Sequence, residues 1–97
     1  MEPVKRVEII TLSIQVEPLC RKLKKAGAPG FTILPEAQGA GQRGVRRGDE
    51  LTGVSGNSVI LVACPESALE SILAAVGPVL RDYGGVCLVS DAHCLKH

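Results

Sequence analysis

The chain has 97 residues, which is enough for one domain with a single core but too few for a second domain of ordinary size. Hydrophobic residues make up 45% of it, yet it holds one Phe, one Tyr and no Trp, which leaves little aromatic surface for stacking nucleobases. Because 11 Lys and Arg stand against 10 Asp and Glu, the net charge is +1, which excludes the strongly basic field of a nucleic-acid-binding domain.

The apolar segments and the cysteines predict the cellular setting. No apolar run reaches the roughly 18 residues of a membrane span, and residues 1–14 carry Glu8 in their apolar part and lack the cleavage site of a signal peptide. The cysteines have no CxxC spacing, and three of the four lie in apolar runs, as packed reduced thiols do. We therefore expect a cytoplasmic protein with no membrane insertion and no disulfides.

The first half of the chain predicts a strand, a helix and a second strand. Residues 4–14 alternate with apolar residues on both faces, which favours a central strand. Residues 16–26 have apolar positions at helical spacing and end at Gly27. The basic run at residues 21–25 fits a solvated helix face better than a phosphate or membrane patch. Residues 31–35 then form a short β-branched strand.

The second half predicts a strand, a helix and a last strand. Residues 58–64 are nearly all apolar and β-branched, as in a buried strand. Residues 65–82 repeat apolar positions at helical spacing, and we expect Gly77 and Pro78 to interrupt this helix with a kink near Val76. A tight connection leads to a last strand at residues 86–89.

The element order is βαββαβ, which is typical of the α+β, ferredoxin-like fold. This fold packs two helices on one face of a four-stranded antiparallel sheet, and we expect residues 1–97 to form a single such domain. Residues 38–57 are then a long loop between the second and third strands, longer than a connection without function usually is. Its glycines and arginines suit an anion, although a solvated loop fits the same composition.

Known phosphate motifs do not explain this loop. Residues 39–44 match GxGxxG, but no helix begins within the glycines, so a Rossmann domain is excluded. A P-loop is excluded because Val45 and Arg46 replace its Lys and Ser or Thr. Residues 93–97 hold two His and one Cys, which fit a frayed tail better than a metal site, and no Ser-His or Cys-His pair predicts catalysis. We expect no metal and no enzymatic activity.

Three motifs together resemble the PII-like signalling proteins. They are GAPGFT at residues 27–32, the Gly39-x-Gly41-x-Arg43-x-x-Arg46 turn, and DYGG at residues 82–85. The resemblance covers nearly the whole chain in order and spacing. It is nearest to the carbon-concentrating branch, which comprises the SbtB-like and carboxysome-associated PII proteins.

The resemblance implies a homotrimer whose sheets face inward, with an adenine nucleotide (AMP, ADP, ATP or cyclic AMP) in each cleft between subunits. It also implies bicarbonate as a ligand and a bicarbonate transporter or another carbon-metabolism protein as the partner, regulated through ordering of the loop. Thr32 would approach the adenine. The phosphates would be held by Gly39, Gly41, Gln42, Arg43 and Arg46, and the cleft would be closed by Gly84, Gly85 and Val86.

Two features set the chain apart from related branches. Residues 38–57 contain no tyrosine, so the uridylylation of nitrogen-regulatory PII proteins is not expected. The paired-cysteine extension of SbtB proteins is missing, so their redox switch is not expected. Two other classes share the element order. An ACT-like regulatory module would bind amino acids at a dimer interface, and an acylphosphatase-like hydrolase would need a Gly/Arg turn after the first strand, where residues 13–16 have neither residue.

Overall fold

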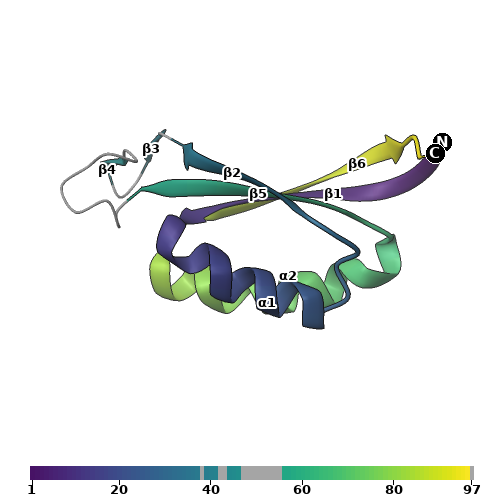
Figure 1. Ribbon diagram of the computed structural model, residues 1–97, viewed down its shortest axis with the longest axis horizontal. Coiled ribbons are helices and arrows are strands. Elements are labelled where there is room, and N and C mark those ends of the chain that lie inside the picture. Colours follow the sequence, from purple (N-terminus) through teal and green to yellow (C-terminus); the bar gives the residue numbers. More distant parts are fainter. Residues whose placement is uncertain (38, 42–43, 47–55, 97) are drawn as a thin grey trace.

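A computed structural model describes residues 1–37, 39–41, 44–46 and 56–96 of the chain (Figure 1). Two helices lie against one face of a four-stranded antiparallel sheet, which confirms the predicted ferredoxin-like α+β fold. In chain order the elements are β1 (Glu2–Leu12), the 3-10 turn η1 (Ser13–Gln15), α1 (Val16–Lys25), β2 (Thr32–Ala37), β3 (Gly39–Gly41), β4 (Gly44–Arg46), β5 (Asn57–Cys64), α2 (Glu66–Tyr83) and β6 (Val86–Cys94).

The sheet has the strand order β2-β5-β1-β6, so β1 is central as predicted and β2 and β6 are the edges. Pro35 lies in β2, where an edge strand tolerates a residue that cannot donate a backbone hydrogen bond. All pairings are antiparallel, with Ile9 opposite Ile60 on β5 and opposite Cys87 on β6.

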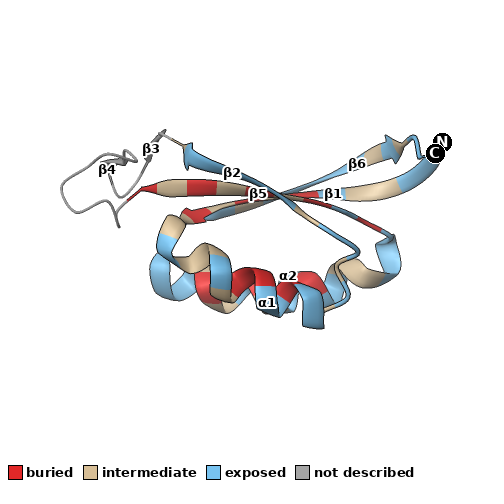
Figure 2. Cartoon of the chain, in the orientation of Figure 1, coloured by how far each residue is buried: buried red, intermediate tan, exposed pale blue. Residues whose placement is uncertain are grey.

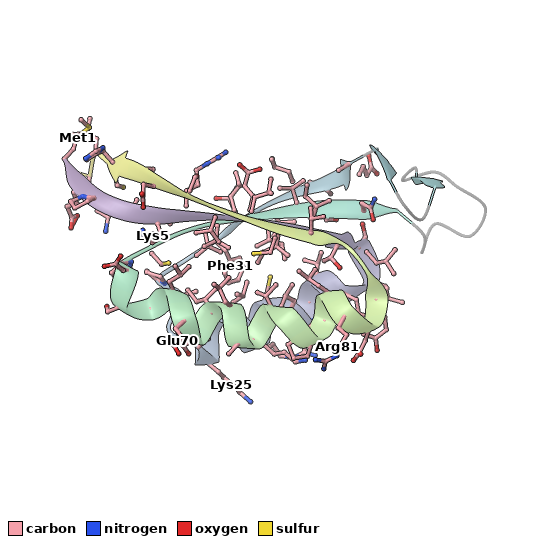
Figure 3. The ribbon with its side chains drawn as sticks, turned by 180° about the vertical axis from the view of Figure 1, so that it is seen from behind. Met1, Lys5, Lys25, Phe31, Glu70 and Arg81 are labelled. Atoms are coloured by element: carbon pink, nitrogen blue, oxygen red, sulfur yellow. The ribbon has the colours of Figure 1, made fainter. Side chains whose placement is uncertain are left out.

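The core lies between the sheet and the helices, where Figure 2 shows the buried residues gathered. Alternate residues of β1 and β5 supply its sheet side, and helically spaced residues of α1 and α2 supply the other. Each such side chain stabilises the fold by about 1.5–3 kcal/mol when removed from water. Phe31 packs against this cluster, while Lys25 points away from the sheet (Figure 3). The largest fully buried apolar side chains are those of Ile9, Leu19, Leu23, Ile60 and Ile72.

The predicted interruption of the second helix was wrong, because α2 runs unbroken through Pro78 to Tyr83. A proline clashes with the Cβ of the residue before it when that residue is helical, and Gly77 has no Cβ. Val76 and Val79 are buried on the two sides of this pair, so packing against the core stabilises the helix before and after it. The kink expected near Val76 stays a prediction. No helix in the described ranges is long and apolar enough to cross a membrane.

The ends of the sheet also differ from the prediction. β6 continues to Cys94 instead of ending near residue 89, so His93 and Cys94 are strand residues and not a frayed tail. Residues 2–4 of β1 pair with this extension, and Lys5 Nζ donates to Asp91 Oδ1 at 2.5 Å. β1 in turn ends at Leu12, because the chain begins a 3-10 turn at Ser13, whose carbonyl accepts the N–H of Val16.

The face of the sheet opposite the helices, here called the open face, is largely apolar. Register places Ile10, Val59, Leu61, Leu34, Val86 and Leu88 on it. Leu88 is 56% exposed and Leu34 is 49% exposed. Arg6 and Glu8 of β1 share this face and form an ion pair with each other, next to the apolar residues. Apolar side chains with these exposures are unfavourable in water, so the open face requires a cover.

Candidate functional site

The base of the long connection forms a small hairpin, which the sequence did not predict. β3 and β4 pair antiparallel, with Gly39 opposite Arg46 and Gly41 opposite Gly44. The glycine-rich composition has no alternating apolar pattern, so nothing in it indicated a strand. Gln42 and Arg43, which stand between the two strands in sequence, lie outside the described residues. The hairpin brings the main chains of Gly39, Gly41 and Arg46 together.

The chain enters this hairpin through a bulge in β2. The pairing of β2 with β5 shifts register between Leu34 and Ala37, and Glu36 adopts a left-handed φ of 60°. A non-glycine residue in this conformation is uncommon and marks a place where the backbone is redirected. No residue pattern predicted the bulge, because Glu is not a typical left-handed residue. The bulge changes the direction of the strand where it leaves the sheet.

The chain returns to the sheet at a point that is hydrogen-bonded to the end of β1. The Ser13 N–H donates to the Gly56 carbonyl at 2.7 Å, and the hydroxyls of Ser13 and Ser58 lie 2.7 Å apart. Gly56 and Ser58 are both buried. These contacts fix the position at which β5 begins.

A glycine turn connects α2 to β6 at the same end of the molecule. Gly84 and Gly85 have φ values of 82° and 121°, which are accessible to glycine and strained for other residues. The Gly84 N–H caps α2 by donating to the Leu80 carbonyl at 2.8 Å. The buried Thr11 hydroxyl donates to the Gly84 carbonyl at 3.2 Å. The Gly84-Gly85 motif was found from the sequence. Thr11 was not found, because its hydrogen bond to Gly84 joins residues 73 positions apart.

The predicted site residues fall into three places. Gly39, Gly41 and Arg46 lie in the hairpin, and Gly84, Gly85 and Val86 lie at the start of β6. Ala37 and Leu12 both pair with Asn57, and Val86 pairs with Ile10, so these two groups share one end of the sheet (Figure 1). The edge strands stand three strand spacings apart, which is about 14 Å.

Thr32 lies apart from these two groups. It is an exposed residue of β2 opposite Leu61, on the open face and four rungs from the Ala37–Asn57 pair, which is roughly 13 Å along the strand. One chain therefore does not bring Thr32 to the end of the sheet where the glycines lie. Among the described residues, no group of three His, Cys, Asp or Glu is placed to hold a metal ion.

Comparison with known proteins identifies the family. The profile of the nitrogen regulatory protein P-II family matches residues 4–97. CPII of Thiomonas intermedia K12, solved with ADP, AMP and bicarbonate, is 28% identical over 95% of this chain and 88% of its own, with a TM-score of 0.86. A PII-like signaling protein of Thermus thermophilus is 25% identical over 97% and 91%, with a TM-score of 0.80.

A more distant relative shares the fold. GlnK of B. subtilis, in complex with ATP, is 18% identical over 95% of this chain and 84% of its own, with a TM-score of 0.66. No curated protein matches the sequence. These findings confirm the resemblance drawn from the three motifs, while the assignment to the carbon-concentrating branch stays a prediction. The chain belongs to the nitrogen regulatory protein P-II family.

Proposed function

We propose that the chain is a trimeric regulatory protein that binds an adenine nucleotide in each cleft between subunits. AMP, ADP, ATP and cyclic AMP are the candidate nucleotides, and bicarbonate is a candidate second ligand. The observation that carries this proposal is that the β3–β4 hairpin and the Gly84–Gly85 turn lie at one end of the sheet. The related Thiomonas intermedia protein, solved with ADP, AMP and bicarbonate, supports the choice of ligands.

The chemistry of both groups suits a phosphate. Glycines let a phosphate approach the backbone N–H groups closely, and a guanidinium can bind two phosphate oxygens at once. We assign Gly39, Gly41 and Arg46 to the phosphates, together with Gln42 and Arg43, which stand outside the described residues. Gly84, Gly85 and Val86 would close the cleft from the opposite edge.

The open face supports assembly into a trimer. Its exposed leucines and valines would be buried if three sheets faced one another, and burial would stabilise the assembly by about 25 cal/mol per Å² of apolar surface. Thr32 lies on this face, away from the glycines of its own chain, so it would approach the adenine bound at the end of a neighbouring sheet. The sites would then be incomplete without a second copy.

In this proposal residues 1–97 act as one PII-like domain and the output is regulatory. PII family proteins are signalling proteins, and the chain would regulate the uptake or metabolism of inorganic carbon through residues 38–57. A bicarbonate transporter or another protein of carbon metabolism would be the partner. The chain would act without catalysis of its own.

Titration calorimetry tests the site. Wild-type protein is titrated with AMP, ADP, ATP, cyclic AMP and bicarbonate, and compared with the double variant Arg43→Ala/Arg46→Ala. Two charge-assisted hydrogen bonds contribute about 1.5–3 kcal/mol each, so we expect at least about a hundredfold loss of nucleotide affinity.

The matched control is Arg21→Ala/Lys22→Ala, which removes the same charge from the exposed face of α1. We expect this control to bind as the wild type does. Unchanged affinity in the Arg43/Arg46 variant would overturn the site assignment, and absence of nucleotide binding by the wild type would overturn the proposed function.

A further inference from the structure

The turn between α2 and β6 is held by a hydroxyl from the central strand. Thr11 is 1% exposed, and its Oγ1 donates to the carbonyl oxygen of Gly84 at 3.2 Å. Gly84 is buried, whereas Gly85 and Val86 are exposed. The turn thus has an inner peptide group fixed to β1 and an outer part that faces away from the core.

The geometry of one peptide unit links these two sides. The carbonyl of Gly84 and the N–H of Gly85 belong to the same planar peptide, and the described residues include no cis peptide bond. In a trans peptide the C=O and the N–H point in opposite directions. Because the Gly84 carbonyl is directed inward to Thr11, the Gly85 N–H is directed outward, on the exposed side of the turn.

The direction of this peptide decides whether the turn can face an anion. It follows directly on the C-terminus of α2, where helix carbonyls carry about half a negative charge. If the peptide flipped, the Gly84 carbonyl would add its own partial negative charge on the outer side. Since both glycines have positive φ and glycine rotates freely, their own conformational preference does not prevent such a flip.

We propose that Thr11 is a positioning residue for nucleotide binding, which rests on the proposed function above. Its hydroxyl keeps the Gly84 carbonyl away from the ligand and the Gly85 N–H directed toward the phosphates. Thr11 does not touch the ligand. It acts through the orientation of one peptide group, from a buried position on β1.

The experiment combines affinity with a local NMR signal. Thr11→Val and Thr11→Ala remove the hydroxyl, and Thr11→Ser retains it. Ile72→Val is the control for stability, because Ile72 is fully buried in α2 and loses one methyl group about 18 Å along the helix from Gly84. ADP binding is measured by calorimetry, and the amide resonance of Gly85 is followed during the same titration. Unfolding in urea is measured for all variants.

We expect the hydroxyl-free variants to bind ADP about fivefold more weakly, as the loss of one neutral hydrogen bond implies. The chemical shift of their Gly85 amide should change less on binding. Thr11→Ser should keep both the affinity and the chemical-shift change of the wild type. Ile72→Val should lose stability but keep its affinity. Two hydroxyl-free variants are used so that a folding failure of one leaves the other to be measured.

Three outcomes would overturn the proposal in distinguishable ways. Unchanged affinity in a folded hydroxyl-free variant would refute the positioning role of Thr11 and leave the proposed function intact. Equal weakening by Ile72→Val would show that general stability, not the turn, controls affinity. A wild-type protein that binds no AMP, ADP or ATP would refute the proposed function, and the role of Thr11 with it.

Discussion

Gly85 lies directly against the main chain of Ile10, so that a Cβ on Gly85 would stand 2.2 Å from the Ile10 carbonyl oxygen. Such a contact is too short for any real Cβ, and the oxygen that it would meet belongs to the backbone of the central strand, which cannot move aside as a side chain could. The second glycine of the DYGG motif is therefore required by the fold, whether or not a ligand approaches it.

Gly85→Ala should destabilise the protein by about 3 kcal/mol or more, because steric overlap adds to the strain of a positive φ. Alanine substitutions at two other glycines separate the contribution of steric overlap from that of backbone strain. Gly27 has a φ of 98° and open space around its Cβ position. Gly27→Ala should therefore lower the free energy of unfolding by about 1 kcal/mol, from backbone strain alone. Gly30 has open space and no such φ, so Gly30→Ala should stay within about 0.5 kcal/mol. Urea unfolding of the three variants measures the difference, and equal losses at Gly85 and Gly27 would contradict the steric argument.

Much of the fold could be predicted because its signals are local. The helical spacing of Leu19 and Leu23 and the apolar run of β5 depend only on neighbouring residues, and both elements formed within a few residues of the expected bounds. The extension of β6 to Cys94 was missed because its support comes from residues 2–5, at the other end of the chain. Polar residues such as Asp91 left it without apolar alternation.

The candidate site was predictable to a different degree. Glycines and arginines near residues 39–46 stand out by composition, and Gly84-Gly85 stands out as a turn. Their arrangement could not be predicted, because it depends on the bulge at Glu36, the Ser13–Gly56 hydrogen bond and the Thr11–Gly84 hydrogen bond. Each of the two hydrogen bonds joins residues more than forty positions apart, so only the folded chain reveals it.

A charge on the open face should dissociate the proposed trimer. Leu88 lies on this face opposite Glu8 and is 56% exposed in the single chain. In Leu88→Lys an ammonium would have to enter the contact between sheets, at a desolvation cost of several kcal/mol per ion. The Glu8 carboxylate opposite it is already paired with Arg6 and so offsets little of this cost. We expect light scattering to give the mass of three chains for the wild type and of one chain for the variant.

The matched control for this prediction is Leu73→Lys. Leu73 is 37% exposed but belongs to α2, on the opposite side of the sheet. This variant should keep the mass of the wild type. A wild-type protein with the mass of one chain would contradict the trimer, and a Leu88→Lys protein with the mass of three chains would contradict the assignment of the open face as its interface.

The thiols should differ in reactivity according to their burial. All four cysteines are free, and burial raises the pKa of the Cys20 and Cys64 thiols, which lowers their thiolate fraction at neutral pH. Both lie in the core, whereas Cys94 is half-buried near the end of β6. We expect Cys20 and Cys64 to react with a disulfide reagent at pH 8 at least about tenfold more slowly than Cys94. Mass spectrometry of partly labelled protein identifies the sites, and rapid labelling of Cys20 in folded protein would contradict the packing.

The ion pair between Lys5 and Asp91 should make stability depend on pH in two separate ranges. The hydrogen bond and charge of Lys5 lower the pKa of the Asp91 carboxyl, and the hydrogen bond to Asp91 chiefly raises the pKa of the Lys5 ammonium. Glu66, whose carboxylate lies 3.5 Å from Lys5 Nζ, also raises the pKa of Lys5. The pair joins the extension of β6 to β1.

The signs of these shifts set the two ranges. A carboxyl with a lowered folded pKa contributes stability above its ordinary pKa of about 3.9, and this contribution disappears as the pH falls through the folded value. A lysine with a raised folded pKa contributes below its ordinary pKa of about 10.4, and this contribution disappears as the pH rises through the folded value. The urea midpoint of Asp91→Asn should therefore lie below that of the wild type between about pH 4 and pH 10, and the two should converge at lower and at higher pH.

The control is Glu70→Gln, which removes an exposed carboxylate of α2 outside this cluster. The difference in urea midpoint between Glu70→Gln and the wild type should not show the pH dependence expected for Asp91→Asn. Because the Asp91 side chain is 83% exposed, 1 M salt should reduce the Asp91 effect in the middle range. A difference between wild type and Asp91→Asn that stayed constant down to pH 2 would show that the lost stability came from packing of the strand end, not from the ion pair.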